Sequence, residues 1–134
     1  MGDKVRLEVP GKLEYMQTVR LTVGGIASTC GFDVEKVNDI QLAVEDAIKF
    51  VVCHGGEGFS ESFDIEAELE KDRLIISVSD YCSKGKITKE HRLFCMRCPE
   101  EGDMGIFVIE SLMDSYKLEV REDGNKKLIM VKNK

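Results

Sequence analysis

The chain has 134 residues, the size of one domain, which excludes an enzyme whose cleft lies between two large lobes. Hydrophobic residues make up 43% and charged residues 33%, and with only 2 prolines the chain is expected to fold. The formal net charge of −6 argues against a protein that binds the phosphate backbone of nucleic acids through its overall charge.

The sequence carries no sign of export or of membrane insertion. No apolar run approaches the roughly 20 residues of a membrane span, and the N-terminus lacks the apolar stretch of a signal peptide. We therefore expect a cytoplasmic protein that binds neither a membrane nor nucleic acid directly. Five cysteines, an odd number, argue against a secreted disulfide framework and leave free, metal-bound or redox-active thiols.

The first half of the chain predicts one strand followed by two helices. Residues 4–10 alternate aliphatic with polar or charged side chains, as in a strand. Apolar residues then recur every three or four positions over 13–30 and again over 33–51, which predicts two helices. Gly31 can cap the first helix, and Asp33 is a good N-cap for the second.

The second half begins with an expected hairpin of two strands, residues 62–69 and 73–79. Residues 81–103 show no clean period, and a long irregular segment in a compact domain is usually a lid or a functional loop. The apolar spacing then predicts a third helix over residues 104–113.

A terminal hairpin is expected from strands 116–121 and 127–132. This order of elements is not the alternation of a doubly wound parallel sheet. It predicts an α/β fold of the two-layer α+β sandwich type, with a mixed, mostly antiparallel sheet and about three helices on one face.

Three segments carry a resemblance to a known family: IQLAVEDAIKFVVCHG at 40–55, LIISVSD at 74–80 and EGDMGIFVIESLMDSYKLEV at 101–120. Their order and spacing resemble the single-domain anti-sigma-factor serine kinases, which are Bergerat-type ATPases like histidine kinases, gyrase and Hsp90. The third segment is the most specific, because it is close to the family's Gly-x-x-Gly-Leu helix opening and Leu-Met-Asp end.

The resemblance implies a single histidine-kinase-like ATPase domain over residues 1–134, with a lid at about 81–103. It implies that ATP is held between the second helix, the lid and the start of the third helix. Members of the family bind a sigma factor as a protein partner, phosphorylate a serine on an antagonist protein, and often form homodimers.

Four positions match the family's site in full or in part. Asp80 is placed as the carboxylate that accepts a hydrogen bond from the adenine amino group. Gly102 and Gly105 flank the start of the third helix, where backbone N–H groups can meet phosphates. Asp46 takes the place of the catalytic acidic residue, one methylene shorter than the usual Glu. Asp46 can also be read as an ordinary surface carboxylate.

Other positions depart from the family pattern. Phe50 stands where an Asn would hold Mg²⁺, and a phenyl ring cannot ligate a cation that requires oxygen. The other reading of Phe50 is an ordinary core aromatic on a helix that lacks the family chemistry, and the remaining alternative is that the register of the match is misplaced here. The two glycine positions after Asp80 are Cys82 and Lys84, and the Gly-Thr before the last strand is replaced near Asn125. Binding of ATP and Mg²⁺ is therefore in doubt.

The predicted lid is rich in soft metal ligands. Cys82, His91, Cys95 and Cys98 fall within a 17-residue window, and such a set could hold zinc or an iron–sulfur cluster. A reversible disulfide between Cys95 and Cys98 and simple packing of the thiols as small apolar groups are the alternatives. Cys30 lies on the apolar stripe of the first helix and is expected in the core.

Three functions remain open at this point. The first is a regulatory protein that binds a sigma factor or an antagonist-like regulator on a scaffold with eroded ATP and Mg²⁺ motifs. The second is an active ATP-dependent serine kinase that acts on an antagonist protein. The third is a regulator that responds to redox state or metal through the cysteines of the lid.

Overall fold

The computed structural model describes residues 2–51, 54–55, 58–59, 62–81, 107–120 and 126–134. Its elements, in chain order, are β1 (Asp3–Pro10), the 3-10 turn η1 (Leu13–Tyr15), α1 (Met16–Thr29), α2 (Val34–Val51), β2 (His54–Gly55), β3 (Gly58–Phe59), β4 (Ser62–Leu69), β5 (Arg73–Tyr81), β6 (Ser115–Val120) and β7 (Lys126–Asn133). Residues 107–112, between β5 and β6, are helical.

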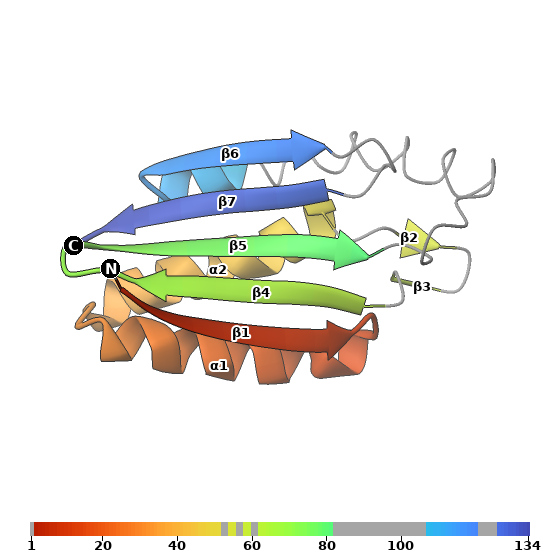
Figure 1. Cartoon of the computed structure of the whole chain (residues 1–134), viewed down its shortest axis with the longest axis horizontal. Coiled ribbons are helices and arrows are strands. Elements are labelled where there is room, and N and C mark those ends of the chain that lie inside the picture. Colours follow the sequence, from red (N-terminus) through yellow and green to blue (C-terminus); the bar gives the residue numbers. More distant parts are fainter. Residues whose placement is uncertain (1, 52–53, 56–57, 60–61, 82–106, 121–125) are drawn as a thin grey trace.

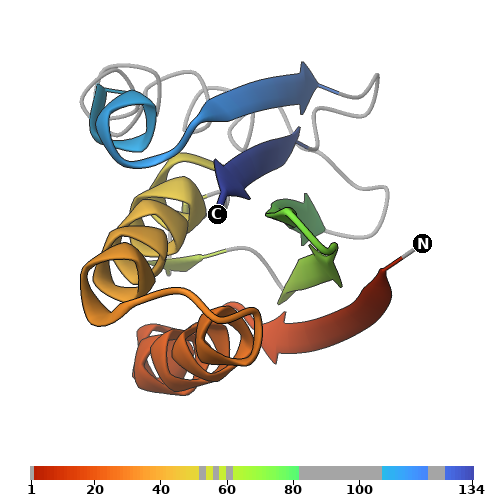
Figure 2. The same cartoon turned by 90° about the vertical axis from the view of Figure 1, so that its left-hand side faces the viewer.

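Five strands form one sheet in the order β1-β4-β5-β7-β6, and all four pairings in it are antiparallel. The helices lie on one face of this sheet, and no described helix covers the other face (Figures 1 and 2). The predicted α/β fold, with a mostly antiparallel sheet and three helices on one face, is confirmed. The short hairpin of β2 and β3 was not predicted, because two-residue strands carry no periodic signal.

Both predicted helix boundaries near residue 31 have a local chemical cause. Gly31 has φ +92°, a backbone conformation that L side chains rarely adopt, and it follows the last turn of α1. The Asp33 carboxylate accepts a hydrogen bond from the Lys36 backbone N–H at 2.9 Å, which satisfies one of the free N–H groups at the start of α2. The connection between α1 and α2 is therefore short and well defined.

The core lies between the helices and one face of the sheet. Side chains that alternate along β4 and β5 point to the helices, and the apolar stripes of α1 and α2 meet them there. Its largest fully buried members include Phe63, Ile40, Ile48, Ile65, Leu74, Ile76, Ile109, Leu128 and Met130. Cys30 is 8% exposed, so the expectation that it belongs to the core is confirmed.

The predicted lid begins one residue later than the sequence indicated. β5 extends to Tyr81, so the first residue assigned to the lid belongs to a strand, and residues 82–103 lie outside the described residues. None of the helices in the described part of the chain combines the length and the apolarity needed to cross a bilayer.

Candidate nucleotide site

α2 carries the two positions that the resemblance assigned to phosphate chemistry. Asp46 and Phe50 lie four residues apart on α2, so one turn of helix separates them on the same side. Asp46 is half-buried. Phe50 lies in the last turn of α2, and its side chain is outside the described part of the structure. The helix therefore has the four-residue spacing that the sequence predicted for Asp46 and Phe50.

Asp80 occupies the end of β5 and points to the helix-covered side, like Leu74, Ile76 and Val78 on the same strand. It is 2% exposed, and its Oδ1 accepts a hydrogen bond from the Lys126 backbone N–H at 2.9 Å. This bond joins the end of β5 to the beginning of β7. The carboxylate is therefore held in one orientation by the backbone of a neighbouring strand.

The described elements that carry the predicted site residues have their ends on one side of the molecule. The last turn of α2, the end of β5 and the beginning of β7 all lie at the same end in Figure 1. α2 packs against β5 and β7 on the helix-covered side. The fold thus brings the turn that contains Asp46 and Phe50 to the end of the sheet that carries Asp80.

The third helix is fixed at its C-terminal end by a lysine that the sequence did not single out. Lys132, on β7, donates a hydrogen bond from Nζ to the Leu112 carbonyl oxygen, and the same nitrogen lies 4.0 Å from Asp39 Oδ2 on α2. Its side chain is 12% exposed. A cation at this place satisfies a free carbonyl group and the negative end of the helix dipole. Lys132 therefore joins three elements.

Several predicted site residues lie outside the described residues. They are Gly102 and Gly105, assigned to phosphate binding, and Cys82, His91, Cys95 and Cys98, assigned to a metal. Within the described ranges, no group of three or more His, Cys, Asp or Glu side chains could hold a metal ion. Burial raises the pKa of the Cys30 thiol, and the charge of Lys134 lowers it to a smaller extent. Cys30 is therefore suited to packing rather than to thiolate chemistry.

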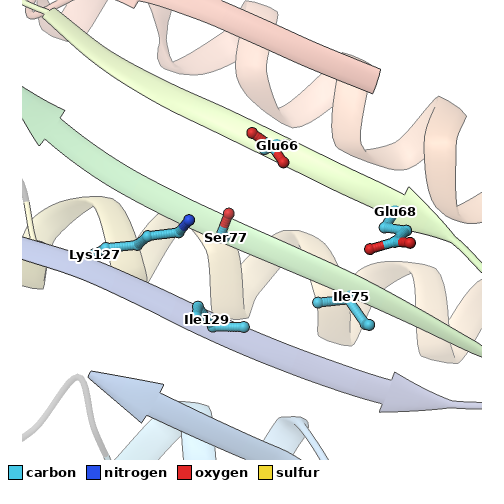
Figure 3. A pocket seen from close by; sticks show the side chains of 6 residues that line it. All are labelled: Glu66, Glu68, Ile75, Ser77, Lys127 and Ile129. Atoms are coloured by element: carbon cyan, nitrogen blue, oxygen red, sulfur yellow. The ribbon is translucent and has the colours of Figure 1, made fainter. Parts of the chain in front are cut away.

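The open face of the sheet carries a shallow groove that is separate from these residues. Figure 3 shows its lining side chains, from β4, β5 and β7: Glu66, Glu68, Ile75, Ser77, Lys127 and Ile129. Asp80 points to the opposite face of the same sheet. The groove therefore takes no part in the candidate nucleotide site.

The chain is similar to known proteins over most of its length. Residues 9–132 match the family model of the histidine kinase-like ATPase domain. The serine-protein kinase RsbW of Listeria innocua is 34% identical over 126 residues, which cover 88% of this chain and 80% of that protein. The RsbW of Halalkalibacterium halodurans is 33% identical over 141 aligned positions, covering 97% and 83%.

One solved structure shares the fold at low sequence identity. It is the crystal structure of the SiaB–SiaC complex from Pseudomonas aeruginosa, in which the matched chain has a TM-score of 0.59 and 9% identity. The match covers 96% of this chain and 88% of that chain. It supports the same two-layer architecture over nearly the whole sequence.

Proposed function

Because the chain belongs to the histidine kinase-like ATPase domain family, with RsbW serine-protein kinases among its relatives, we propose that it is a regulatory protein that binds a protein partner. In this proposal the nucleotide-binding scaffold is retained, and phosphate transfer is weak or absent. The partner is a sigma factor or an antagonist-like regulator, as the resemblance of the sequence to anti-sigma-factor kinases implies.

The residue at position 50 carries this proposal. Phosphoryl transfer needs Mg²⁺ to neutralise charge between the β- and γ-phosphates, and Mg²⁺ needs oxygen ligands. α2 places Phe50 one turn after Asp46, where the family has an Asn. Loss of that ligand removes a large electrostatic contribution to the transition state rather than a small contact.

Asp80 supports retention of nucleotide binding in this proposal. Asp80 is buried, and its carboxylate accepts a hydrogen bond from the Lys126 amide. In this proposal the same carboxylate accepts the hydrogen bond from the adenine amino group. A site with an adenine acceptor and no Mg²⁺ ligand is expected to bind the base without discriminating strongly between ATP and ADP. Such binding can still regulate the binding of a protein partner, because a ligand shifts the protein toward the conformation that it binds more tightly.

The test combines nucleotide binding with phosphate transfer. Isothermal titration with ATP and with ADP, each with and without Mg²⁺, is expected to give similar affinities in all four cases. A transfer assay on a candidate antagonist protein that contains the target serine is expected to show little phosphorylation. Magnesium-dependent turnover at the rate of ordinary protein kinases would end this proposal.

An active serine kinase is the second candidate, favoured by Asp46. A half-buried carboxylate stands on α2 where the family's catalytic base stands, and other carboxylates could bind Mg²⁺. Asp46→Asn would then abolish transfer while leaving nucleotide affinity nearly unchanged. Glu45→Gln is the matched control, because it removes one charge from the neighbouring position, where Glu45 lies 3.6 Å from Arg20.

The cysteine site remains a third proposal. Cys82, His91, Cys95 and Cys98 would bind zinc or an iron–sulfur cluster and make partner binding depend on metal or redox state. Metal analysis and a visible absorption spectrum of anaerobically purified protein test it, since an iron–sulfur cluster is coloured and zinc is not. A colourless, metal-free preparation with freely titratable thiols would dispose of it. Cytoplasmic location and homodimer formation likewise stay predictions.

A further inference from the structure

We propose that the open face of the sheet binds a basic segment of a protein partner, and that an arginine or lysine side chain of this segment lies in the groove of Figure 3. The groove is lined by side chains of β4, β5 and β7, and no described helix covers this face. Asp80 points to the other face, so this contact leaves the candidate nucleotide site open. The inference does not depend on the proposed function.

The register of the strands gives the groove two different ends. Its middle rank consists of three residues that lie opposite one another on neighbouring strands: Glu66, Ser77 and Ile129. Glu68 and Ile75 face each other in the next rank, and Lys127 lies one rank away in the opposite direction. The groove therefore has carboxylates along β4, aliphatic side chains on β5 and β7, and a cation at one end only.

The aliphatic side chains of this face have no cover among the described elements. Ile75 and Val131 lie directly opposite each other, and Ile129 is the next residue of β7 on the same face. All three are half-buried, whereas their neighbours on the helix-covered face are fully buried. Adjacent aliphatic side chains that remain in contact with water offer a surface on which a partner can bury apolar groups.

The carboxylates of β4 are not neutralised by the described residues. Among these residues, neither Glu66 nor Glu68 forms an ion pair or a hydrogen bond through its side chain. Arg6 lies opposite Glu66 on β1 but pairs with Asp64. Lys4 lies opposite Glu68 on β1, while in Figure 3 the Glu68 carboxylate lies toward β5. Two carboxylates are therefore available to a cation that a partner brings.

Lys127 sets the position of that cation. It lies two strands and two ranks from Glu68, which places the two Cα atoms roughly 16 Å apart at standard strand spacings. In Figure 3 its ammonium group turns toward Ser77, at the other end of the groove from Glu68. A cation beside Glu68 therefore gains more from the two carboxylates than it loses to Lys127.

The size of the groove fits one side chain. Its volume is about 150 Å³, below the roughly 300–1,000 Å³ of pockets that enclose a small molecule. An arginine or lysine side chain combines methylene groups with a charged end. It can cover Ile75 with its methylene groups and reach Glu66 and Glu68 with its charge. The occupant is therefore a side chain that a larger partner presents.

A methyl-resolved NMR titration of the full chain with two capped peptides tests the site. The first peptide has arginine and isoleucine by turns at every second position, with serine between them, and the second has glutamine in place of arginine. The arginine peptide is expected to shift the methyl signals of Ile75 and Ile129. The signals of Ile40 and Ile48, which are fully buried beneath the sheet, should not move.

Two changes of condition test the role of charge. The dissociation constant of the arginine peptide should rise with salt, because salt shortens the Debye length from about 10 Å at 0.1 M to about 3 Å at 1 M. The glutamine peptide is expected to bind about fivefold more weakly or less tightly still.

Single charge removals separate the groove from the rest of the open face. Glu68→Gln is expected to raise the dissociation constant of the arginine peptide about fivefold. Glu8→Gln is the matched control, because it removes the same charge from β1 on the same face but outside the groove. It should leave the dissociation constant nearly unchanged. Circular dichroism on each variant separates loss of binding from loss of folding.

Four outcomes would overturn the proposal. The first three are no shift at Ile75 and Ile129, equal affinity for the two peptides, and equal losses in Glu68→Gln and Glu8→Gln. The fourth is a shift of the same methyl signals with the concentration of the protein alone, which would show that a second copy covers this face. ATP titrations of the same variants keep the two proposals distinct, because neither change touches the candidate nucleotide site.

Discussion

Replacing Gly24 or Gly25 with alanine tests how α1 is fitted against α2, the helix that carries Asp46 and Phe50. A Cβ atom at Gly24 would lie 2.5 Å from Gln41 Nε2, whereas a Cβ at Gly25 meets nothing within 4 Å. Gln41 Nε2 donates a hydrogen bond of 2.9 Å to the Arg20 carbonyl oxygen, which links α2 to α1. An alanine side chain is therefore expected to fit at position 25 and to displace the Gln41 side chain at position 24.

The magnitudes follow from those contacts. Alanine is better than glycine inside a helix by about 1 kcal/mol, so Gly25→Ala is expected to stabilise the protein by about that amount. Gly24→Ala has the same intrinsic gain, but the Gln41 side chain must move and lose a hydrogen bond worth about 1 kcal/mol. The two effects nearly cancel, and the free energy of unfolding is expected to change by less than about 0.5 kcal/mol.

Urea denaturation followed by circular dichroism measures both variants under one set of conditions. The difference between them should be about 1 kcal/mol, with unchanged slopes. Adding Gln41→Ala removes the obstacle, so in that background the two glycine replacements should stabilise the protein equally. Equal stabilisation in the wild-type background would show that Gln41 does not fill the space beside Gly24.

Three further outcomes are expected. Lys132→Met removes the cation at the end of the third helix. Urea denaturation should then show a free energy of unfolding lower by about 1–2 kcal/mol. Arg6→Gln takes away the ion-pair partner of the buried Asp64, whose Oδ1 has no hydrogen bond. In a double-mutant cycle, Arg6→Gln should lower the free energy of unfolding by about 1 kcal/mol. This loss should be absent in an Asp64→Asn background. The hydrogen bond that the Tyr116 hydroxyl donates to Glu110 raises the pKa of Tyr116. The stabilisation from this bond is therefore present below the ordinary tyrosine range and lost as the pH rises through the folded-state pKa. Thermal unfolding at alkaline pH should show this loss in the wild type and not in Tyr116→Phe.

The periodic elements could be predicted because their signals are local. β4 was predicted with the bounds that the structure has, since alternation and the flanking polar residues lie within the segment itself. α2 begins where the Asp33 cap predicts. The β2 and β3 hairpin has no such signal, because each strand has only two residues.

The contacts that support the site could not be predicted, because they join residues far apart in the sequence. The amide of Lys126 lies 46 residues from Asp80, and a backbone donor has no signature in the side-chain pattern. Lys132 follows the alternation of β7, and a lysine near a chain end is ordinarily assigned to solvent. The sequence did place Asp46 and Phe50 on one side of a helix, because a spacing of four residues has that meaning in any helix.

The most direct test of the proposed function compares the wild type with Phe50→Asn, which returns an oxygen ligand to the position one turn after Asp46. ATP affinity would be measured by isothermal titration with and without Mg²⁺ for both proteins, with Phe50→Leu as the matched control. Mg²⁺ is expected to leave ATP affinity unchanged in the wild type and in Phe50→Leu, and to strengthen it in Phe50→Asn. A wild type that binds ATP only with Mg²⁺, as tightly as Phe50→Asn does, would contradict the account.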